Sequence, residues 1–293
     1  MDPLPESRIG PPAARRERWL AGGEVPHLPN AEKELNSEPT VPSIARIYDY
    51  WLGGTANYPV DREAAEQAIA ANPGIVADVR ANRGFLARAV THLAADRGIR
   101  QFLDIGSGLP TVRNTHEVAQ SVAPESRVVY VDRDPAVAAH ARALLATATA
   151  GTTAFVQSDL RDVDRVLAGA GAVLDLSQPV AVMLLIVLHL IPDSEEPRGV
   201  VADLMKRLAP GSYLVISHPA SDIRPAAMAE MTRRVNARLT SASGTMRGRA
   251  AVTAFFDGMT LVPPGVVQPQ QWRQDASFAE PDVTAWCGIG RTR

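Results

Sequence analysis

A glycine turn that follows an acid is the part of this sequence best suited to hold a ligand. Asp104 stands two residues before Gly106, and Ser107 and Gly108 complete the turn. The residues around Asp104 are apolar and predict a buried strand, and a helix is expected to begin soon after the turn. A strand, a glycine turn and a helix in this order bring backbone N–H groups close to a ligand. The carboxylate favours a cationic or hydrogen-bond-donating ligand over a pyrophosphate, because like charges repel.

The turn lacks one feature of dinucleotide-binding folds. Those folds prefer the pattern G-x-G-x-x-G, in which the third glycine lets the helix pack against the strand. Thr111 occupies the third position here. An NAD-dependent dehydrogenase is therefore the least favoured interpretation of the turn.

Two more acids stand where the next two strands are expected to end. Asp132 closes the second apolar run, with Arg133 beside it, and a carboxylate there can accept hydrogen bonds from both hydroxyls of a ribose. Asp159 and Leu160 close the third run, where a carboxylate and backbone can meet the amino edge of an adenine. The alternative for Asp159 is an N-cap of the following helix. Together the three strand ends predict a site for an adenosine with a cationic, phosphate-free extension, and S-adenosylmethionine fits that description.

The alternation of apolar runs with helical segments predicts the sheet that would hold these acids. Continuous apolar runs separated by helices are typical of parallel strands covered on both faces. Two closing runs without a full helix between them predict an antiparallel hairpin at the sheet edge. The expected strands are 101–105, 127–131, 153–157, 180–190, 213–217, 260–262 and 283–289. The expected helices between them are 115–122, 135–145, 163–167, 198–208, 225–239 and 249–255.

Three more helices are expected before the first strand, and they are candidates for a lid. Open α/β sheets bind ligands at the carboxyl ends of their strands, so we expect the helices to lie there. Tyr48, Asn57 and Tyr58 then become candidate cofactor contacts, with a core position as the alternative for Tyr48. Arg83 would bind the cofactor's carboxylate through a bidentate fork, or it belongs to a surface pair. The expected ranges are 44–52, 61–71 and 75–95.

The first 42 residues differ in character from the rest of the chain. They contain many prolines and scattered charges without a sustained period, which predicts a disordered or loosely attached tail with a short helix at 13–21 as an option. We therefore expect three parts. They are a tail over 1–42, a helical cap over 43–98 and a ligand-binding domain over 99–293.

Composition limits the partners of the chain. The 293 residues carry a formal net charge of -2, and no basic stripe indicates a nucleic-acid substrate. Cys287 is the only cysteine, which leaves no intrachain disulfide and no multi-cysteine metal site. The longest apolar run, 180–191, is too short to span a bilayer, and the N-terminus has no apolar leader. We expect a cytoplasmic protein with no membrane partner and no metal.

Five blocks of the sequence resemble the actinobacterial S-adenosyl methyltransferase family, long catalogued as a domain of unknown function. They are SIARIYDYWLGG (43–54), RANRGFLARAV (80–90), QFLDIGSGLPT (101–111), VVYVDRDP (128–135) and APGSYLVISH (209–218). The resemblance extends from about Pro42 to the C-terminus. It implies the Rossmann-like class I methyltransferase fold, an α/β fold with a mostly parallel seven-stranded sheet and a reversed last strand, plus an N-terminal helical cap. It also implies S-adenosylmethionine as the cofactor.

His189 is the best candidate for a catalytic base, because it ends the expected fourth strand and that end borders the transferred methyl group in this fold. A buried core histidine is the alternative, and His218 is a weaker candidate. The resulting hypothesis is a methyltransferase that acts on a small molecule, for example of secondary metabolism, with a homodimer as an option for its assembly. The first alternative is a protein that binds S-adenosylmethionine or its demethylated product without turnover.

Overall fold

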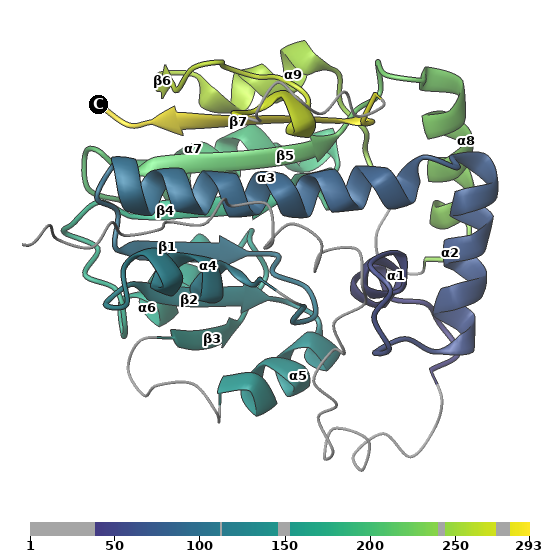
Figure 1. Cartoon of the computed structure of the whole chain (residues 1–293), viewed down its shortest axis with the longest axis horizontal. Helices are drawn as coiled ribbons and strands as arrows, with labels where there is room; N and C mark the ends of the chain where they lie inside the picture. The colour runs from purple at the N-terminus through teal and green to yellow at the C-terminus, as the bar shows by residue number, and fades with distance from the viewer. Residues whose placement is uncertain (1–38, 112, 146–152, 240–243, 274–281) are drawn as a thin grey trace, which may run out of the picture.

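The computed structural model describes residues 39–111, 113–145, 153–239, 244–273 and 282–293 (Figure 1). Most of the predicted tail, including the optional helix at 13–21, lies outside these residues. The division into tail, cap and binding domain stays a prediction.

A seven-stranded sheet forms the centre of the described chain, in the order β3-β2-β1-β4-β5-β7-β6. The first five strands are parallel, whereas β7 runs antiparallel to both β5 and β6. The predicted reversal of the last strand is therefore confirmed. The strands are β1 (Gln101–Ile105), β2 (Arg127–Asp132), β3 (Thr153–Gln157), β4 (Ala181–Leu185), β5 (Tyr213–Pro219), β6 (Thr260–Leu261) and β7 (Ala285–Arg291).

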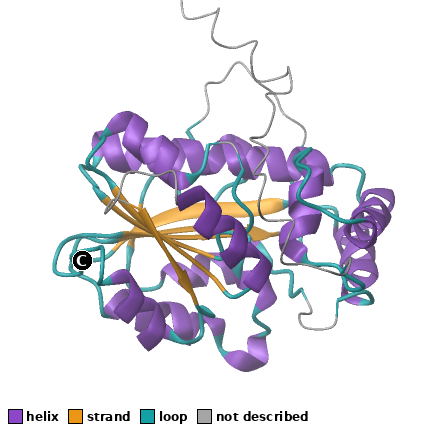
Figure 2. Ribbon diagram, turned by 90° about the horizontal axis from the view of Figure 1, so that it is seen from below, coloured by secondary structure: helices purple, strands orange, loops and turns teal. Residues whose placement is uncertain are grey.

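Helices lie on both faces of the sheet and at one end of it (Figure 2). The α-helices are α1 (Ile44–Trp51), α2 (Pro59–Ala71), α3 (Ile75–Asp96), α4 (Thr115–Val122), α5 (Pro135–Leu145), α6 (Val163–Ala170), α7 (Pro197–Lys206), α8 (Pro225–Asn236) and α9 (Arg249–Thr253). Short 3-10 turns are η4 (Leu188–Leu190), η5 (Asp193–Glu195), η6 (Ala254–Phe256) and η7 (Pro269–Gln271).

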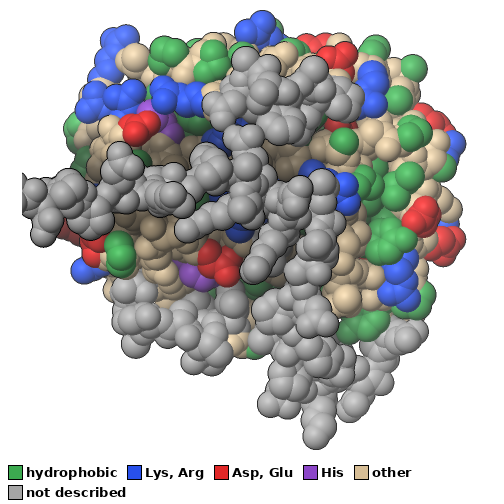
Figure 3. All heavy atoms as spheres, in the orientation of Figure 1, with side chains coloured by type: hydrophobic (Ala, Val, Ile, Leu, Met, Phe, Trp, Pro, Cys, Tyr) green, Lys and Arg blue, Asp and Glu red, His purple; other side chains and the backbone are tan. Residues whose placement is uncertain are grey.

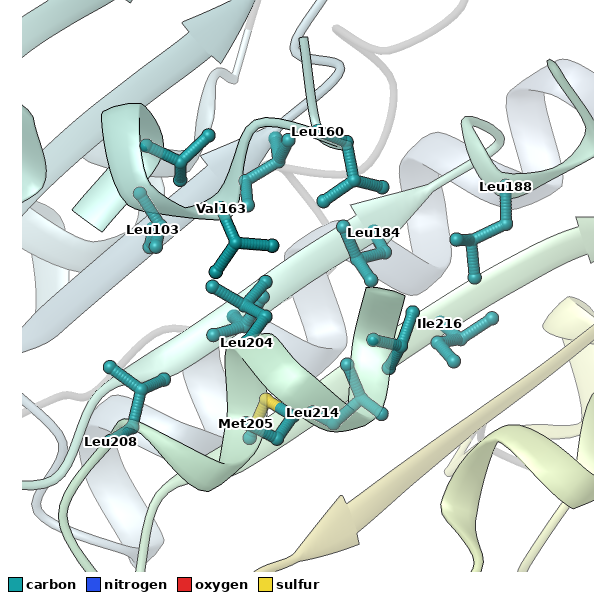
Figure 4. Close-up of a cluster of buried hydrophobic side chains, with 14 of the residues drawn as sticks. Leu103, Leu160, Val163, Leu184, Leu188, Leu204, Met205, Leu208, Leu214 and Ile216 are labelled. Atoms are coloured by element: carbon teal, nitrogen blue, oxygen red, sulfur yellow. The ribbon is translucent and has the colours of Figure 1, made fainter. Parts of the chain in front are cut away.

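Strand side chains alternate between two hydrophobic cores, as the period of two requires. Leu103 and Leu184 point into a core shared with α6 and α7, which Figure 4 shows in close-up. Phe102 and Met183 point to the other face, into a core completed by α3. Burial on both faces explains why the strands read as continuous apolar runs.

The helix α3 occupies a different place from the one expected. It was predicted to belong to the cap, but it lies along one face of the sheet (Figure 1), and Phe85, Val90 and Leu93 are fully buried there. The helices α1 and α2, with α8 beside α2, lie at the carboxyl ends of the parallel strands. The lid is therefore built from α1, α2 and α8, with only the start of α3.

The strand β4 ends five residues earlier than predicted. Its last residue is Leu185, because Ile186 has a φ of 51° and turns the chain out of the sheet. The apolar run in the sequence extends past the end of β4 because Leu188 and Ile191, which follow the strand, are also buried in the core. His189 therefore lies in η4 and not at the strand end.

No single charge dominates the described residues on the face drawn in Figure 3. Acidic and basic side chains are interspersed over the part of the face that Figure 3 leaves uncovered. In the described segments no helix is both long and apolar enough to cross a membrane.

Candidate functional site

A cavity of about 450 Å3 lies at the carboxyl ends of the parallel strands, between their tips and α1. This volume is in the range of pockets for small molecules and cofactors. Most of the ligand-binding residues predicted from the sequence line it. They are Tyr48, Arg83, Asp104, Gly106, Ser107, Gly108, Asp132, Arg133, Asp159 and Leu160.

The glycine turn uses both of its glycines for backbone conformations that other residues avoid. Gly106 has a φ of 73° and Gly108 a φ of 65°. Gly106 N donates to Val131 O at 2.8 Å, which holds the turn against β2. A Cβ on Gly106 would come within 2.3 Å of Val187 Cγ2, so the space a side chain would need is already filled. The first glycine is therefore required by the packing of the turn itself.

Asp104 is buried below the turn, with only 7% of its surface exposed. Its Oδ2 accepts a hydrogen bond of 2.6 Å from Thr115 Oγ1 of α4. Burial raises the pKa of Asp104 to about 6, although the Thr115 hydrogen bond and the Arg83 charge act in the opposite direction. The carboxylate is thus poised to gain from a cationic partner.

Asp132 links the glycine turn to the loop after β2. Its Oδ2 accepts from Gly108 N and its Oδ1 from Asp134 N, both at 2.9 Å. Burial raises its pKa, and these backbone hydrogen bonds oppose the effect. Asp134 in turn accepts from Ser43 Oγ at 2.8 Å, which connects α1 to the rim of the cavity. No local sequence pattern predicts this last contact, because it joins residues 91 positions apart.

Asp159 is held by arginines. Arg161 donates to it through Nε at 2.8 Å and Nη2 at 2.7 Å, and Arg133 donates at 3.3 Å. Burial alone would raise the pKa of Asp159, but the Arg161 hydrogen bonds and the two positive charges outweigh it and hold the pKa at about 2. The N-cap of α6 is Asp162, whose side chain accepts from Arg165 N. The N-cap alternative for Asp159 therefore does not hold.

The helix α3 contributes two neighbouring polar residues. Asn82 Nδ2 donates to Tyr48 Oη at 2.9 Å, and Ser217 Oγ donates to Asn82 Oδ1 at 2.6 Å. This chain of bonds ties α1 to α3 and to β5. Arg83 Nη2 donates to Arg113 O at 2.8 Å, so one of its groups braces the loop after β1. Only Arg83 of this pair was predicted to face the ligand, but both line the cavity.

Two predicted contacts lie outside the cavity. Asn57 Nδ2 donates to Asp49 Oδ2 and Gly54 O, both at 2.9 Å, and these bonds shape the loop between α1 and α2. Tyr58 is the N-cap residue of α2, and its ring lies under the guanidinium of Arg46 at 5.5 Å. Local capping and loop contacts hold both residues, and their contact with the cofactor stays a prediction.

Comparison with known proteins identifies the family of the chain. A family model described as S-adenosyl methyltransferase matches residues 30–293. The chain belongs to the S-adenosyl methyltransferase family. The resemblance seen in the sequence blocks is thereby confirmed. No functionally curated protein is detectably similar in sequence.

Two solved structures of bacterial proteins share the fold of this family member. A duf574 family protein from Streptomyces avermitilis is 40% identical with a TM-score of 0.82, and the match covers 86% of this chain and 98% of that one. A provisionally assigned methyltransferase from Thermobifida fusca is 39% identical with a TM-score of 0.79, and the match covers 92% and 98%. The predicted methyltransferase fold is therefore confirmed over most of this chain and nearly the whole of the two solved structures.

S-adenosylmethionine is the cofactor of this family, and the cavity fits it. The glycine turn offers backbone without side chains, and carboxylates end three neighbouring strands. A cationic sulfonium and amino group suit Asp104, whose buried carboxylate accepts one side-chain hydrogen bond within the described part of the chain. The fit therefore rests on which residues line the cavity and on where the fold places them.

The two candidate bases have different surroundings. His218 Nε2 accepts from Arg247 Nη1 at 2.9 Å and its Nδ1–H donates to Pro219 O at 2.9 Å, so both ring nitrogens are engaged. Burial lowers the pKa of His218 to about 4. Arg247 also donates to Leu188 O and Ile191 O, which clamps the turn that carries His189. His218 is therefore part of a structural cluster.

His189 does not line the cofactor cavity; it lines a second, smaller cavity beside it. Only 6% of its surface is exposed. Burial lowers its pKa to about 3, with smaller contributions from His218 and Arg247, so the imidazole is neutral near pH 7. With so low a pKa the neutral imidazole is a weak base, and the role of His189 as the catalytic base stays a prediction.

Proposed function

We propose that this protein transfers the methyl group of S-adenosylmethionine to a small-molecule acceptor. The observation that carries the proposal is the single cavity in which Asp104, Asp132 and Asp159, from three neighbouring strand ends, meet the glycine turn under α1. The family membership supports the same activity.

The proposed roles follow from the positions of the side chains. Asp132 accepts hydrogen bonds from the ribose hydroxyls, because its carboxylate is fixed by two backbone N–H groups at the end of β2. Asp104 and the turn of Gly106, Ser107 and Gly108 hold the methionine part. Arg83 lies near enough to Asp104 to affect its pKa, and its charge suits the carboxylate of the same methionine part.

The adenine end is proposed to lie at the tip of β3. Asp159 is fixed there by Arg161, and Arg133 shares the same carboxylate. Four hydrogen bonds, three from Arg161 and one from Arg133, already occupy the lone-pair positions of this carboxylate, so the amino group of adenine would replace the longest of them, the 3.3 Å bond from Arg133. Leu160 is 5% exposed and supplies an apolar wall. Tyr48 of α1 covers the site from the opposite side.

Catalysis is proposed to come mainly from positioning. The bound cofactor supplies an electrophilic methyl group on a sulfonium, which a nucleophile can displace. The protein holds the reacting groups in line, and α1 limits the access of water to the cavity. With at most one base, His189, the acceptor itself must be a competent nucleophile.

Two measurements test the proposed function. Calorimetric titration with S-adenosylmethionine, S-adenosylhomocysteine and NAD should show binding of the first two, and binding of NAD alone would refute the proposal. Labelled methyl groups should then pass from S-adenosylmethionine to the small-molecule fraction of a cell extract. Label that enters only protein or nucleic acid would contradict the acceptor class. No label at full cofactor occupancy would indicate a binding protein without turnover.

The affinity for S-adenosylmethionine is expected to depend on pH through Asp104. Its pKa is raised to about 6, so below that pH a proton must leave the carboxyl before a cationic ligand gains from it. Affinity should therefore rise with pH and level off, with Kd about tenfold weaker at pH 5 than at pH 7. Titrations in buffers of different ionisation enthalpy should show proton release near pH 5.

The variant Asp104→Asn is the control for this pH dependence. It keeps the size of the side chain but cannot ionise, so its affinity should be weaker and should lose most of the change between pH 5 and pH 7. A profile in the variant as steep as that of the wild-type protein would assign the titration to another group, such as Asp132, whose charge acts on Asp104.

A further inference from the structure

A second cavity of about 90 Å3 adjoins the cofactor cavity. Six residues line both, and they come from α1, α3, the turn after β4 and the segment after α8. They are Ile44, Tyr48, Asn82, Ile186, Leu190 and Leu239. A molecule in the second cavity would meet the occupant of the cofactor cavity at this junction. His189 is the neighbour of Leu190 and lines the second cavity only.

The walls of the second cavity are mostly apolar, and three methionines stand out among them. Met228 and Met231 of α8 are 2% and 6% exposed, and Met246 follows from the next segment. Methionine side chains adapt their shape to a ligand, and their sulfur atoms make favourable contacts with aromatic rings. Val235 and Val79 complete this side. The volume and the lining suit one ring or a compact apolar group.

Most polar groups at this cavity already have partners. Asp78 Oδ1 accepts from Thr284 N at 3.1 Å, and its Oδ2 accepts from Asn72 Nδ2 at 3.3 Å. Asn236 Oδ1 accepts from Gly244 N at 2.8 Å. Among the described lining residues Asp78 is the only Asp, Glu, Lys or Arg, and burial raises its pKa. Asp78 is already paired with Arg224 at 3.4 Å, so a charged ligand would lose its hydration without a free counterion in exchange.

Two polar atoms at the cavity have no hydrogen-bond partner within the described part of the chain. They are His189 Nδ1 and Thr232 Oγ1, and both are closed off from solvent. Buried polar atoms without partners are rare in native proteins, and a site that awaits a ligand is one reason for them. A hydroxyl both donates and accepts, so it can satisfy an imidazole in either tautomer and a threonine as well.

We propose that this second cavity is the acceptor site and that it takes an uncharged aromatic molecule whose hydroxyl bonds to His189, with Thr232 as a second partner. This inference rests on the proposed methyltransferase function. In the transfer, the acceptor oxygen forms a bond to the methyl carbon while the carbon–sulfur bond breaks and its electron pair stays on sulfur. The hydroxyl proton passes to the imidazole of His189 and then to solvent.

Binding of three one-ring probes to the S-adenosylhomocysteine complex tests the site. 4-Methylphenol carries the hydroxyl, toluene lacks it, and 4-hydroxybenzoate adds a negative charge. Dissociation constants from ligand-observed NMR should place 4-methylphenol first, with toluene about fivefold weaker for the lost hydrogen bond. 4-Hydroxybenzoate should bind at least about tenfold more weakly for its uncompensated charge. Equal or tighter binding of 4-hydroxybenzoate, or no binding of 4-methylphenol, would overturn the proposal.

Variants locate the bound probe. Val235→Phe fills the cavity with an apolar ring and should abolish the binding of 4-methylphenol. Val122→Phe makes the same change at an exposed position of α4 and should leave it unchanged. His189→Leu should reduce the preference for 4-methylphenol over toluene to near one. Retained binding in Val235→Phe, or a retained preference in His189→Leu, would place the probe elsewhere.

Titration with S-adenosylhomocysteine distinguishes a failure of the proposed function from a failure of the acceptor site alone. If the wild-type protein does not bind it, the proposed function fails. If it binds and the probes do not, only the acceptor site fails. The same titration on Val235→Phe shows whether that variant still folds around the cofactor.

Discussion

Replacement of Asp132 by alanine is expected to weaken the binding of S-adenosylmethionine by about a hundredfold. Two hydrogen bonds from ribose hydroxyls to a carboxylate are lost, and together they are worth roughly 3 kcal/mol. The carboxylate also fixes Gly108 N and Asp134 N, so the variant loosens the turn and the loop that frame the ribose. Calorimetric titration of the purified variant measures the change in Kd.

A modified ligand separates the ribose contact from this loosening. A 2′-deoxyribose analogue of S-adenosylhomocysteine should bind the wild-type protein more weakly than the parent compound. Asp132→Ala should bind the two compounds almost equally, because the partner of the hydroxyl is gone. Asp257→Ala, at an exposed position on the β6 side of the sheet, removes the same charge and should leave both affinities unchanged. An unaltered preference for the parent compound in Asp132→Ala would refute the ribose assignment.

Replacement of Gly106 by alanine is expected to destabilise the fold by about 2–4 kcal/mol. A φ of 73° costs alanine about 1 kcal/mol, and the overlap of its Cβ with Val187 Cγ2 at 2.3 Å adds about 1–3 kcal/mol. The atoms in the way include Val187 Cβ at 2.6 Å, which cannot rotate aside. The free energy of unfolding in urea measures the effect.

Gly108→Ala is the matched control in the same turn. Gly108 has a similar φ of 65°, but among the described residues no atom beyond its two chain neighbours lies within 4 Å of the position of an added Cβ. Its replacement should therefore cost only the conformational part, about 1 kcal/mol. Equal losses of stability in the two variants would mean that the contact with Val187 does not explain the requirement for Gly106.

The turn around Gly106 and the histidine in η4 meet at one place in the fold. Val187, which fills the space beside Gly106, stands two residues before His189. Arg247 holds the same turn through Leu188 O and Ile191 O. The segment after β4 thus connects the cofactor cavity to the proposed acceptor cavity. A substitution at one cavity is therefore expected to affect binding at the other.

Features that depend on neighbouring residues could be predicted from the sequence. The strand, turn and helix around Asp104, the acid at the tip of β2 and the alternation of the elements are local patterns of apolarity and backbone conformation. Because parallel strands bring their carboxyl ends to one edge, these patterns also predicted that Asp104, Asp132 and Asp159 share a cavity. The cofactor followed from the same residues, since their charges suit a cationic adenosine ligand.

Features that depend on packing between distant segments could not be predicted in this way. An apolar run is the same whether it continues a strand or turns into the core, so the end of β4 at Leu185 and the place of His189 were missed. Asn57 has a side chain of the kind that contacts ligands, yet its hydrogen bonds are made within its own loop and it does not line the cavity.

The sequence by itself determined the fold class, the family and the methyl donor, because each rests on short-range patterns that a single chain segment carries. Only the tertiary structure decided that Asp159 is held by Arg161 and that α3 covers the sheet. It alone brought Tyr48, His189 and Met231 to one small cavity. These residues lie far apart along the chain, and long-range packing, which no local pattern encodes, sets their distances.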